Sequence, residues 1–310
     1  EWLEEFLARA KETQAPDRRL LAKALLWIGR LAFLQTDHAA AYKFFEESLE
    51  LSRALNDQEA ISNALGNLGA LAWMRGDSAG ARRLLEESLL LAQGENYDPQ
   101  ITAALIDIGN TVLVEGDYVS ARSCYEASLA TARAYGDARL IAHALDLLGE
   151  VARCLGDYTK AAAYYDEALT LFQPASDKLT QAWTLQDRGR TAKEQGDYSR
   201  AQTFLETSLT FFSELGNREG MAAVFAGTAG VALAQGRLAS ATQLFSAAES
   251  VLKTINRVMW PADRVEYERD LEALRATLGK SEFHAAWAAG LRLTPAEALD
   301  LAFKTVKDMP

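Results

Sequence analysis

The sequence predicts an all-α solenoid of antiparallel helix pairs, closed at its C-terminal end by a helical cap. Two observations carry this prediction: the chain matches itself at a fixed period of 40 residues, and each period contains two helix-breaking positions. The composition agrees, because the 310 residues include only 6 prolines and are rich in Ala, Leu and Glu. Those three side chains lose little rotamer freedom in a helix.

The 40-residue period is visible in three columns of residues. Small residues fill the first two columns, where they would let two helix backbones approach each other, and bulky residues fill the third. The glycine column is Gly29, Gly69, Gly109, Gly149 and Gly189, with Ala229 in the sixth place; the alanine column is Ala41, Ala81, Ala121, Ala161, Ala201 and Ala241; the bulky column is Phe45, Leu85, Tyr125, Tyr165, Leu205 and Phe245.

The four inner periods are divided by a Gly-Asp pair, as in Gly76-Asp77 and Gly156-Asp157, and the outer two have Thr36-Asp37 and Gly236-Arg237 in its place. Glycine can take the left-handed conformation that closes a helix, and the following Asp can accept from the free amides of the next first turn. A second break recurs at residues such as Asn56 and Asn96, which tolerate helix ends. Two helices therefore fill each repeat.

These columns resemble the tetratricopeptide repeat, whose pattern W-x2-L-G-x2-Y followed by A-x3-F is met in part by Leu148-Gly149, Ala152, Ala161 and Tyr165. The resemblance covers residues 18 to 256 and implies a right-handed superhelix. The repeats depart from the family in their length of 40 residues and in lacking the closing proline.

We expect three segments along the chain. Residues 1–14 read as the last helix of a truncated preceding repeat, residues 15–258 as six helical hairpins, and residues 259–310 as a three-helix cap over the last apolar face. Pro261 suits a first helical turn, Ser281 could cap the second helix, and Thr294 with Glu297 has the form of a capping box before the third.

The tail, including Tyr267-Glu268-Arg269 and Ala286-Trp287, is similar to the C-terminal ends of a class of large bacterial regulators. These regulators join a signal-transduction ATPase of the STAND class to a tetratricopeptide array, often with a LuxR-type DNA-binding domain. This resemblance implies that the array is a cytoplasmic sensor in signal transduction or transcription regulation, with an ATPase module upstream in the parent chain. The 310 residues contain no Walker motif. The alternative is a free-standing adaptor that binds peptide or helical segments of partner proteins.

Composition and motifs argue against other function classes. A net charge of −11 disfavours direct contact with nucleic acid, and no apolar run is long enough to span a bilayer. We expect no enzyme activity, no cofactor and no metal. His143 with Asp146 comes nearest to a metal-binding pair, and Cys124 and Cys154 lack thiolate-site spacing. The expected partner is a protein, peptide or small-molecule effector in the concave groove.

The candidate binding site lies in the columns that vary between repeats, on the concave face of each first helix. Because these columns do not repeat, we do not expect the fold to require them. The alternative is a solvated face on which Glu150 and Arg153 form a local helical ion pair. Trp183 is expected to touch a ligand or a neighbouring helix. The residues expected to converge on one patch are His143, Asp146, Glu150, Arg153, Trp183, Gln186, Arg190 and Lys193, and Asn110 and Trp73 are candidates from earlier repeats.

Overall fold

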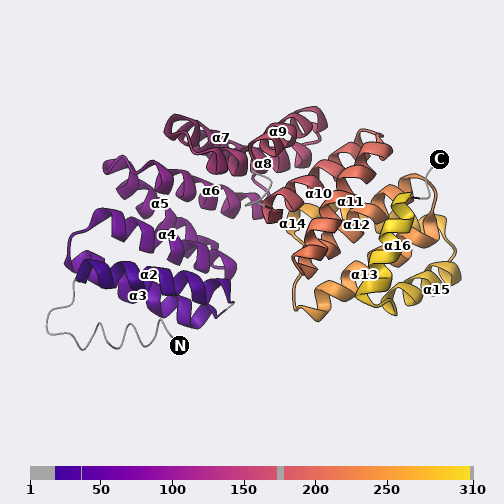
Figure 1. The fold of residues 1–310 in the computed structure, drawn as a ribbon, viewed down its shortest axis with the longest axis horizontal. Coiled ribbons are helices and arrows are strands. Elements are labelled where there is room, and N and C mark those ends of the chain that lie inside the picture. Colours follow the sequence, from indigo (N-terminus) through magenta and orange to yellow (C-terminus); the bar gives the residue numbers. More distant parts are fainter. Residues whose placement is uncertain (1–17, 36, 173–177, 308–310) are drawn as a thin grey trace. The chain divides into compact units, whose positions relative to one another are not determined.

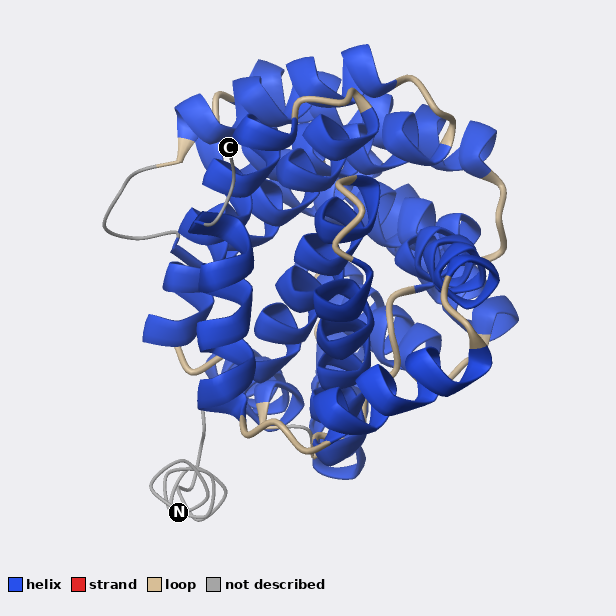
Figure 2. Cartoon of the chain, turned by 90° about the vertical axis from the view of Figure 1, so that its right-hand side faces the viewer, coloured by secondary structure: helices blue, strands red, loops and turns tan. Residues whose placement is uncertain are grey.

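The computed structural model describes residues 18–35, 37–172 and 178–307, and this part of the chain is entirely helical apart from short turns (Figure 2). Its fifteen helices follow one another as sequential antiparallel pairs (Figure 1), which confirms the predicted fold class. The segment expected to be the last helix of a preceding repeat, residues 1–14, lies outside the described residues. The helix pairs are α2 (Arg18–Leu34) with α3 (His38–Ala54), α4 (Gln58–Met74) with α5 (Ser78–Gly94), α6 (Asp98–Val114) with α7 (Tyr118–Tyr135), α8 (Ala138–Cys154) with α9 (Tyr158–Leu171), α10 (Lys178–Glu194) with α11 (Tyr198–Glu214), and α12 (Arg218–Ala234) with α13 (Leu238–Thr254).

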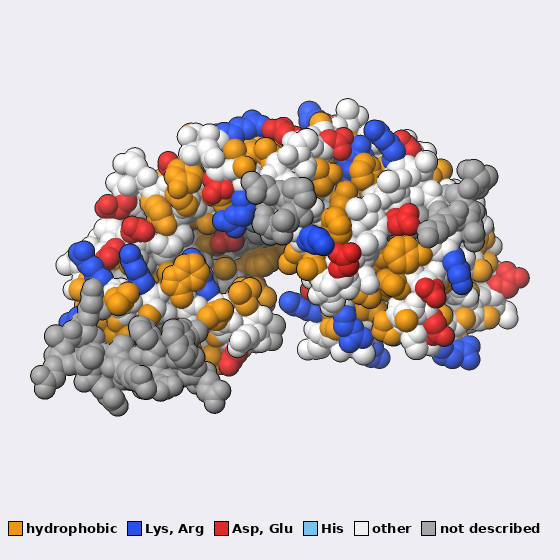
Figure 3. Space-filling model, viewed as in Figure 1, with side chains coloured by type: hydrophobic (Ala, Val, Ile, Leu, Met, Phe, Trp, Pro, Cys, Tyr) orange, Lys and Arg blue, Asp and Glu red, His pale blue; other side chains and the backbone are white. Residues whose placement is uncertain are grey.

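The chain divides into two compact units. Unit 1 is Glu1–Leu140 and holds α2 to α7, and unit 2 is Ile141–Pro310. The boundary falls in the first turn of α8. Unit 2 also contains α14 (Pro261–Thr277), α15 (Lys280–Leu291) and α16 (Pro295–Lys307). On the face seen in Figure 3, Lys and Arg side chains are interspersed with Asp and Glu in both units.

The glycine and alanine columns do hold helix pairs together. A Cβ added to Gly149 would lie 2.6 Å from Cε1 of Tyr165, and one added to Gly69 would lie 2.7 Å from Cγ of Leu85. Both distances are too short for real carbon atoms, so a larger residue at either position would force the facing side chain to shift. Every member of the alanine column is fully buried. The small residues therefore allow the close approach that the bulky column then fills, as predicted.

The turn chemistry also follows the prediction. Gly76 and Gly156 have φ of +81° and +77°, the left-handed region that favours glycine. Oδ1 of Asp77 accepts a hydrogen bond from the backbone amide of Gly80 at 2.9 Å and so caps α5. At the second break, Asn56 and Asn96 adopt φ of +50° and +53°. Asparagine tolerates this conformation better than most residues because its side chain can bond locally.

The C-terminal helices share a core with the last repeat. Leu271, Leu274 and Phe283 are buried together with Phe245 and Leu244 of α13. The predicted capping box is confirmed, since the Thr294 amide donates to Oε2 of Glu297 at 2.8 Å and the Glu297 amide donates to Oγ1 of Thr294 at 3.2 Å. The predicted Ser281 cap is wrong, because α15 begins at Lys280 and its N-cap residue is Gly279.

Candidate functional site

Helix α14 lies against the first helices of the repeats in unit 2 and contacts them through three carboxylates. Asp263, Glu266 and Asp270 follow the spacing i, i+3, i+7, which places them on one face of the helix. The facing cations are Arg153 of α8 and Arg190 and Lys193 of α10. Three acidic side chains of one helix thus meet three basic side chains of two others.

The two arginines share the same pair of carboxylates. Nη2 of Arg190 donates to Oε2 of Glu266 at 2.6 Å, and Nη1 of Arg190 also pairs with Asp263. Nη2 of Arg153 donates to Oδ1 of Asp263 at 2.9 Å, and Nη1 of Arg153 donates to Glu266 at 3.3 Å. Asp187, from α10 itself, completes the cluster at 3.7 Å from Arg153. Multiple contacts of this kind fix a helix in register as well as in place.

Lys193 extends the ionic contact along α14. Its Nζ donates to Oδ2 of Asp270 at 3.2 Å and also to Oε1 of Glu266. On the outer side, Arg269 of α14 donates to Oε1 of Glu194 at 2.8 Å. The side chains of Arg153, Arg190 and Lys193 are only 5–7% exposed, so α14 and its neighbours cover them almost completely.

The N-terminal end of α14 is held by a separate hydrogen bond. Nε1 of Trp260, immediately before the helix, donates to Oε1 of Glu150 on α8. We call the surface that receives Trp260 and the three carboxylates the α14 dock, and define it as Glu150, Arg153, Asp187, Arg190 and Lys193.

Burial changes the acidity of the carboxyl groups in the dock and beside it. Burial, reinforced by the negative charge of Asp187, raises the pKa of Glu150 to about 8 and that of Asp146 to about 7. Burial also raises the pKa of Asp187 to about 6, although Arg153 opposes the shift. Burial alone would raise the pKa of Glu266 too, but Arg190, Lys193 and Arg153 hold it well below its ordinary value. Glu266 is therefore the firmly ionised carboxylate of the cluster.

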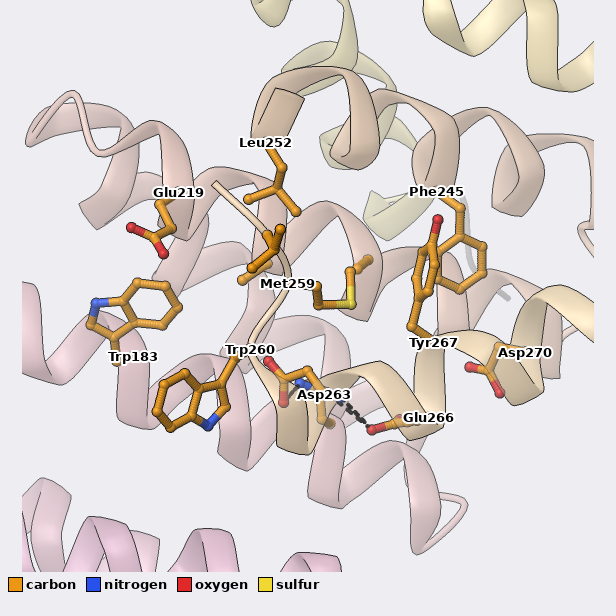
Figure 4. A pocket seen from close by; sticks show the side chains of 14 residues that line it. Trp183, Glu219, Phe245, Leu252, Met259, Trp260, Asp263, Glu266, Tyr267 and Asp270 are labelled. Carbon is orange, nitrogen blue, oxygen red and sulfur yellow. Dashed lines mark hydrogen bonds and ion pairs between the residues drawn. The ribbon is translucent and has the colours of Figure 1, made fainter. Parts of the chain in front are cut away.

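A pocket opens beside the dock, between α10, α12, α13 and the start of α14 (Figure 4). Its wall combines the indole rings of Trp183 and Trp260 with the apolar side chains of Leu252 and Met259, and Glu219 supplies a carboxylate. Arg190, Asp263 and Glu266 also line it, so the pocket and the dock share side chains. A mostly apolar wall with a few polar groups is typical of ligand sites.

The structure brings several of the predicted site residues together but does not leave them open to solvent. Arg153, Arg190 and Lys193 meet under α14, and Glu150 is covered by Trp260. These side chains are therefore buried and paired with α14, so the expectation that the fold does not require them stays a prediction for substitutions to test. The local Glu150–Arg153 ion pair is replaced by contacts of each residue with the C-terminal segment.

The remaining predicted residues of unit 2 are placed differently. Trp183 is half-buried and packs edge-on against Phe212 of α11, with ring centroids 4.8 Å apart, which confirms the contact with a neighbouring helix. Gln186 is buried, Asp146 is half-buried and His143 is exposed. Among the described residues, no three His, Cys, Asp or Glu side chains are arranged to hold a metal ion.

The two candidates from earlier repeats lie in unit 1. Asn110 accepts a hydrogen bond through Oδ1 from the hydroxyl of Tyr125 at 2.7 Å, so it contacts a member of the bulky column. Trp73 is half-buried on α4. Both belong to the first helices of their repeats, as the column analysis placed them.

The residues missed at the sequence level are those that supply the opposite charges: Asp187, Asp263, Glu266 and Asp270. A signal for them exists in the sequence. The i, i+3, i+7 spacing of carboxylates in the tail complements the i, i+3 spacing of Arg190 and Lys193. For Asp263, Glu266 and Asp270 the 40-residue period gives no such signal, because α14 lies outside the repeats.

Comparison with known proteins identifies the family of the repeats. The tetratricopeptide repeat model matches residues 1–93, 100–173 and 141–214, which together make up more than half of the chain, and the chain belongs to this family of repeat proteins. No curated protein matches the sequence. In the described part of the chain, no helix combines the length and apolar character required to cross a membrane.

Three solved structures illustrate the shared fold. A Rap protein complexed with competence and sporulation factor is 15% identical, with a TM-score of 0.62 over 92% of this chain and 80% of that one. The Rap conjugation gene regulator of plasmid pLS20, in complex with the Phr* peptide, is 14% identical, with a TM-score of 0.57 over 88% and 76%. A signal transduction ATPase with numerous domains (STAND) with a tetratricopeptide repeat sensor, from Pyrococcus horikoshii, is 17% identical, with a TM-score of 0.61 over 90% of this chain and 42% of that one.

Proposed function

We propose that this chain is the effector-sensing tetratricopeptide region of a bacterial signal-transduction ATPase or transcriptional regulator. In this proposal a peptide, protein or small molecule binds on the first-helix faces of the repeats, and the parent chain carries an ATPase module upstream. The repeat region acts by binding and not by catalysis. The likeness to a STAND protein with a repeat sensor and to peptide-bound Rap proteins supports this class of function.

The observation that carries the proposal is the α14 dock together with its pocket. Side chains that vary between repeats, including Arg153, Arg190 and Lys193, are used here to hold a helix. The same surface therefore has the chemistry to recognise a folded segment, and the pocket next to it has two indole rings, from Trp183 and Trp260, that suit an apolar or aromatic anchor. An effector in this pocket would contact α14 directly, and its binding could be transmitted through that helix.

Site-specific photo-crosslinking tests the proposal. A photoreactive residue at Ala223, which lines the pocket, should capture a specific species from the source lysate, and the species should then bind the purified chain. Trp183→Ala should abolish this capture, because aromatic anchors commonly contribute about 2 kcal/mol or more to binding. The matched control is the same photoreactive residue at Leu90, an exposed position on α5 of unit 1. Equal labelling at both positions, or capture that survives Trp183→Ala, would refute the proposed site.

A further inference from the structure

The contacts of α14 change in kind along the helix. At the C-terminal end, Leu271 and Leu274 are buried in the apolar core that α14 shares with α12 and α13. From Asp263 to Asp270, three carboxylates form ion pairs with the dock, and Tyr267 of this segment also packs edge-on against Phe245 of α13. Burial of apolar side chains stabilises a contact without requiring a specific partner. A buried ion pair contributes little net stability, but removing one of its partners destabilises the protein strongly because the other charge stays buried alone.

This difference makes the segment from Trp260 to Asp270 exchangeable for a segment of the same chemistry. If another acidic helix replaced it, Arg153, Arg190 and Lys193 would stay paired and desolvated, so the exchange would avoid the penalty of an uncompensated buried charge. A neutral or basic helix would leave the three cations unpaired. The connection also permits movement, because residues 257–260 between α13 and α14 form no helix.

The charge of the dock favours an acidic occupant. Arginine remains protonated in proteins, so Arg153 and Arg190 are fixed positive charges, and the surrounding carboxylates raise the pKa of Lys193 despite its burial. Of the two acidic members of the dock, Glu150 opposes these charges least, because burial raises its pKa to about 8. A helix that brings three carboxylates therefore meets a surface of complementary charge.

We propose that the α14 dock is a receptor site for an acidic helical segment of a partner protein, with residues 260–270 of this chain as its intramolecular occupant when that partner is absent. The segment carries an aromatic residue three positions before the first of three carboxylates spaced i, i+3, i+7, as Trp260 precedes Asp263. This inference rests on the proposed binding function and names the class of partner.

A synthetic peptide with the sequence from Val258 to Leu278 is the probe, and its binding to the full chain is measured by fluorescence anisotropy. The intramolecular occupant competes with the peptide, so the wild-type chain should bind it weakly. Glu266→Gln in the chain weakens that occupant and should tighten peptide binding at least tenfold. Glu268→Gln is the matched control, because Glu268 lies on the same helix, is 66% exposed and does not contact the dock.

The peptide itself supplies the second arm. Replacing the residues that correspond to Asp263, Glu266 and Asp270 by lysine should abolish binding to the Glu266→Gln chain, and added salt should weaken binding of the acidic peptide. Circular dichroism at the assay temperature establishes that the variant is folded; if it is not, Asp263→Asn takes its place in the same measurement. Equal affinity of the two chain variants, or binding of the lysine peptide as tight as that of the acidic one, overturns the proposal.

The two proposals fail separately. If the acidic peptide fails while capture at Ala223 depends on Trp183, effector binding at the pocket stands and only the partner class is wrong. A stable dimer of the Glu266→Gln chain that excludes the peptide would also overturn the inference, because the dock would then receive a second copy of this chain.

Discussion

Glu266 should be the most stability-sensitive carboxylate of α14. Its Oε2 accepts from Nη2 and Nε of Arg190 at 2.6 and 3.1 Å and from Nη1 of Arg153 at 3.3 Å, and its Oε1 accepts from Lys193. Its side chain is 14% exposed. Glu268, two residues further along the same helix, pairs only with Arg264 in the described interactions, at 3.8 Å. The substitutions Glu266→Gln and Glu268→Gln therefore make the same chemical change in two opposite environments.

The magnitudes follow from the number of partners that each substitution leaves behind. Removing one partner of a buried ion pair typically costs about 3–5 kcal/mol, because the opposite charges stay buried without compensation. An exposed pair on one helix contributes at most about 0.5 kcal/mol. For a cooperative unit of this size, each kcal/mol corresponds to roughly 2–4 °C in Tm. Glu266→Gln should therefore lower Tm by roughly 6–20 °C, and Glu268→Gln by no more than about 2 °C.

Thermal melting followed by circular dichroism measures both effects, and amide hydrogen exchange locates them. If the loss is local, the amides of α14 should exchange faster in Glu266→Gln while those of α12 keep their protection. If the two variants melt within 1–2 °C of each other, a margin that corresponds to less than about 1 kcal/mol, the ionic contacts do not hold α14 and the reasoning is wrong.

Three further predictions concern packing, pH and the C-terminal helices. Gly149→Ala should lower the free energy of unfolding by about 1–3 kcal/mol, because the new methyl group would collide with Tyr165. Gly94→Ala is the control: a Cβ at this position would meet no atom within 4 Å, so the free energy of unfolding should change by less than about 1 kcal/mol. Urea denaturation measures both variants. Burial raises the pKa of Glu150 from its ordinary value of 4.5 to about 8, so the contribution of its protonated form to stability is complete below pH 4.5. That contribution is lost as the pH rises toward 8, at roughly 1.4 kcal/mol per pH unit. Glu150→Gln should flatten the fall of Tm between pH 5 and 8, and an unchanged profile would contradict the buried-carboxyl explanation. Ending the chain after Asn256 removes α14 to α16 and uncovers the apolar core around Phe245, so light scattering should detect aggregation; a monomer with an undiminished Tm would show that these helices do not cap unit 2.

The sequence by itself determined the local architecture. Gly149 and Tyr165 are 16 positions apart within one 40-residue period, and their packing depends only on two adjacent helices, so a repeated pattern is enough to predict it. The same holds for the turn at Gly156, where a left-handed φ is required, and for the capping box of Thr294 and Glu297, where the contacts span three residues. Such features are set by short-range sterics and hydrogen bonding, which the order of residues specifies directly.

Only the tertiary structure decided what the varying columns do. Arg190 lies on the face where the column analysis placed it, yet its partner Glu266 is 76 residues away in a segment outside the repeats. Whether Arg190 faces solvent or a carboxylate depends on where α14 packs, and that position is set by the burial of Leu271 and Leu274 in the core of the last repeat. A helical sequence pattern indicates which residues share a face, but not which distant helix covers that face. The free energy of that packing comes from contacts between segments far apart in the sequence, and a local periodicity carries no information about them.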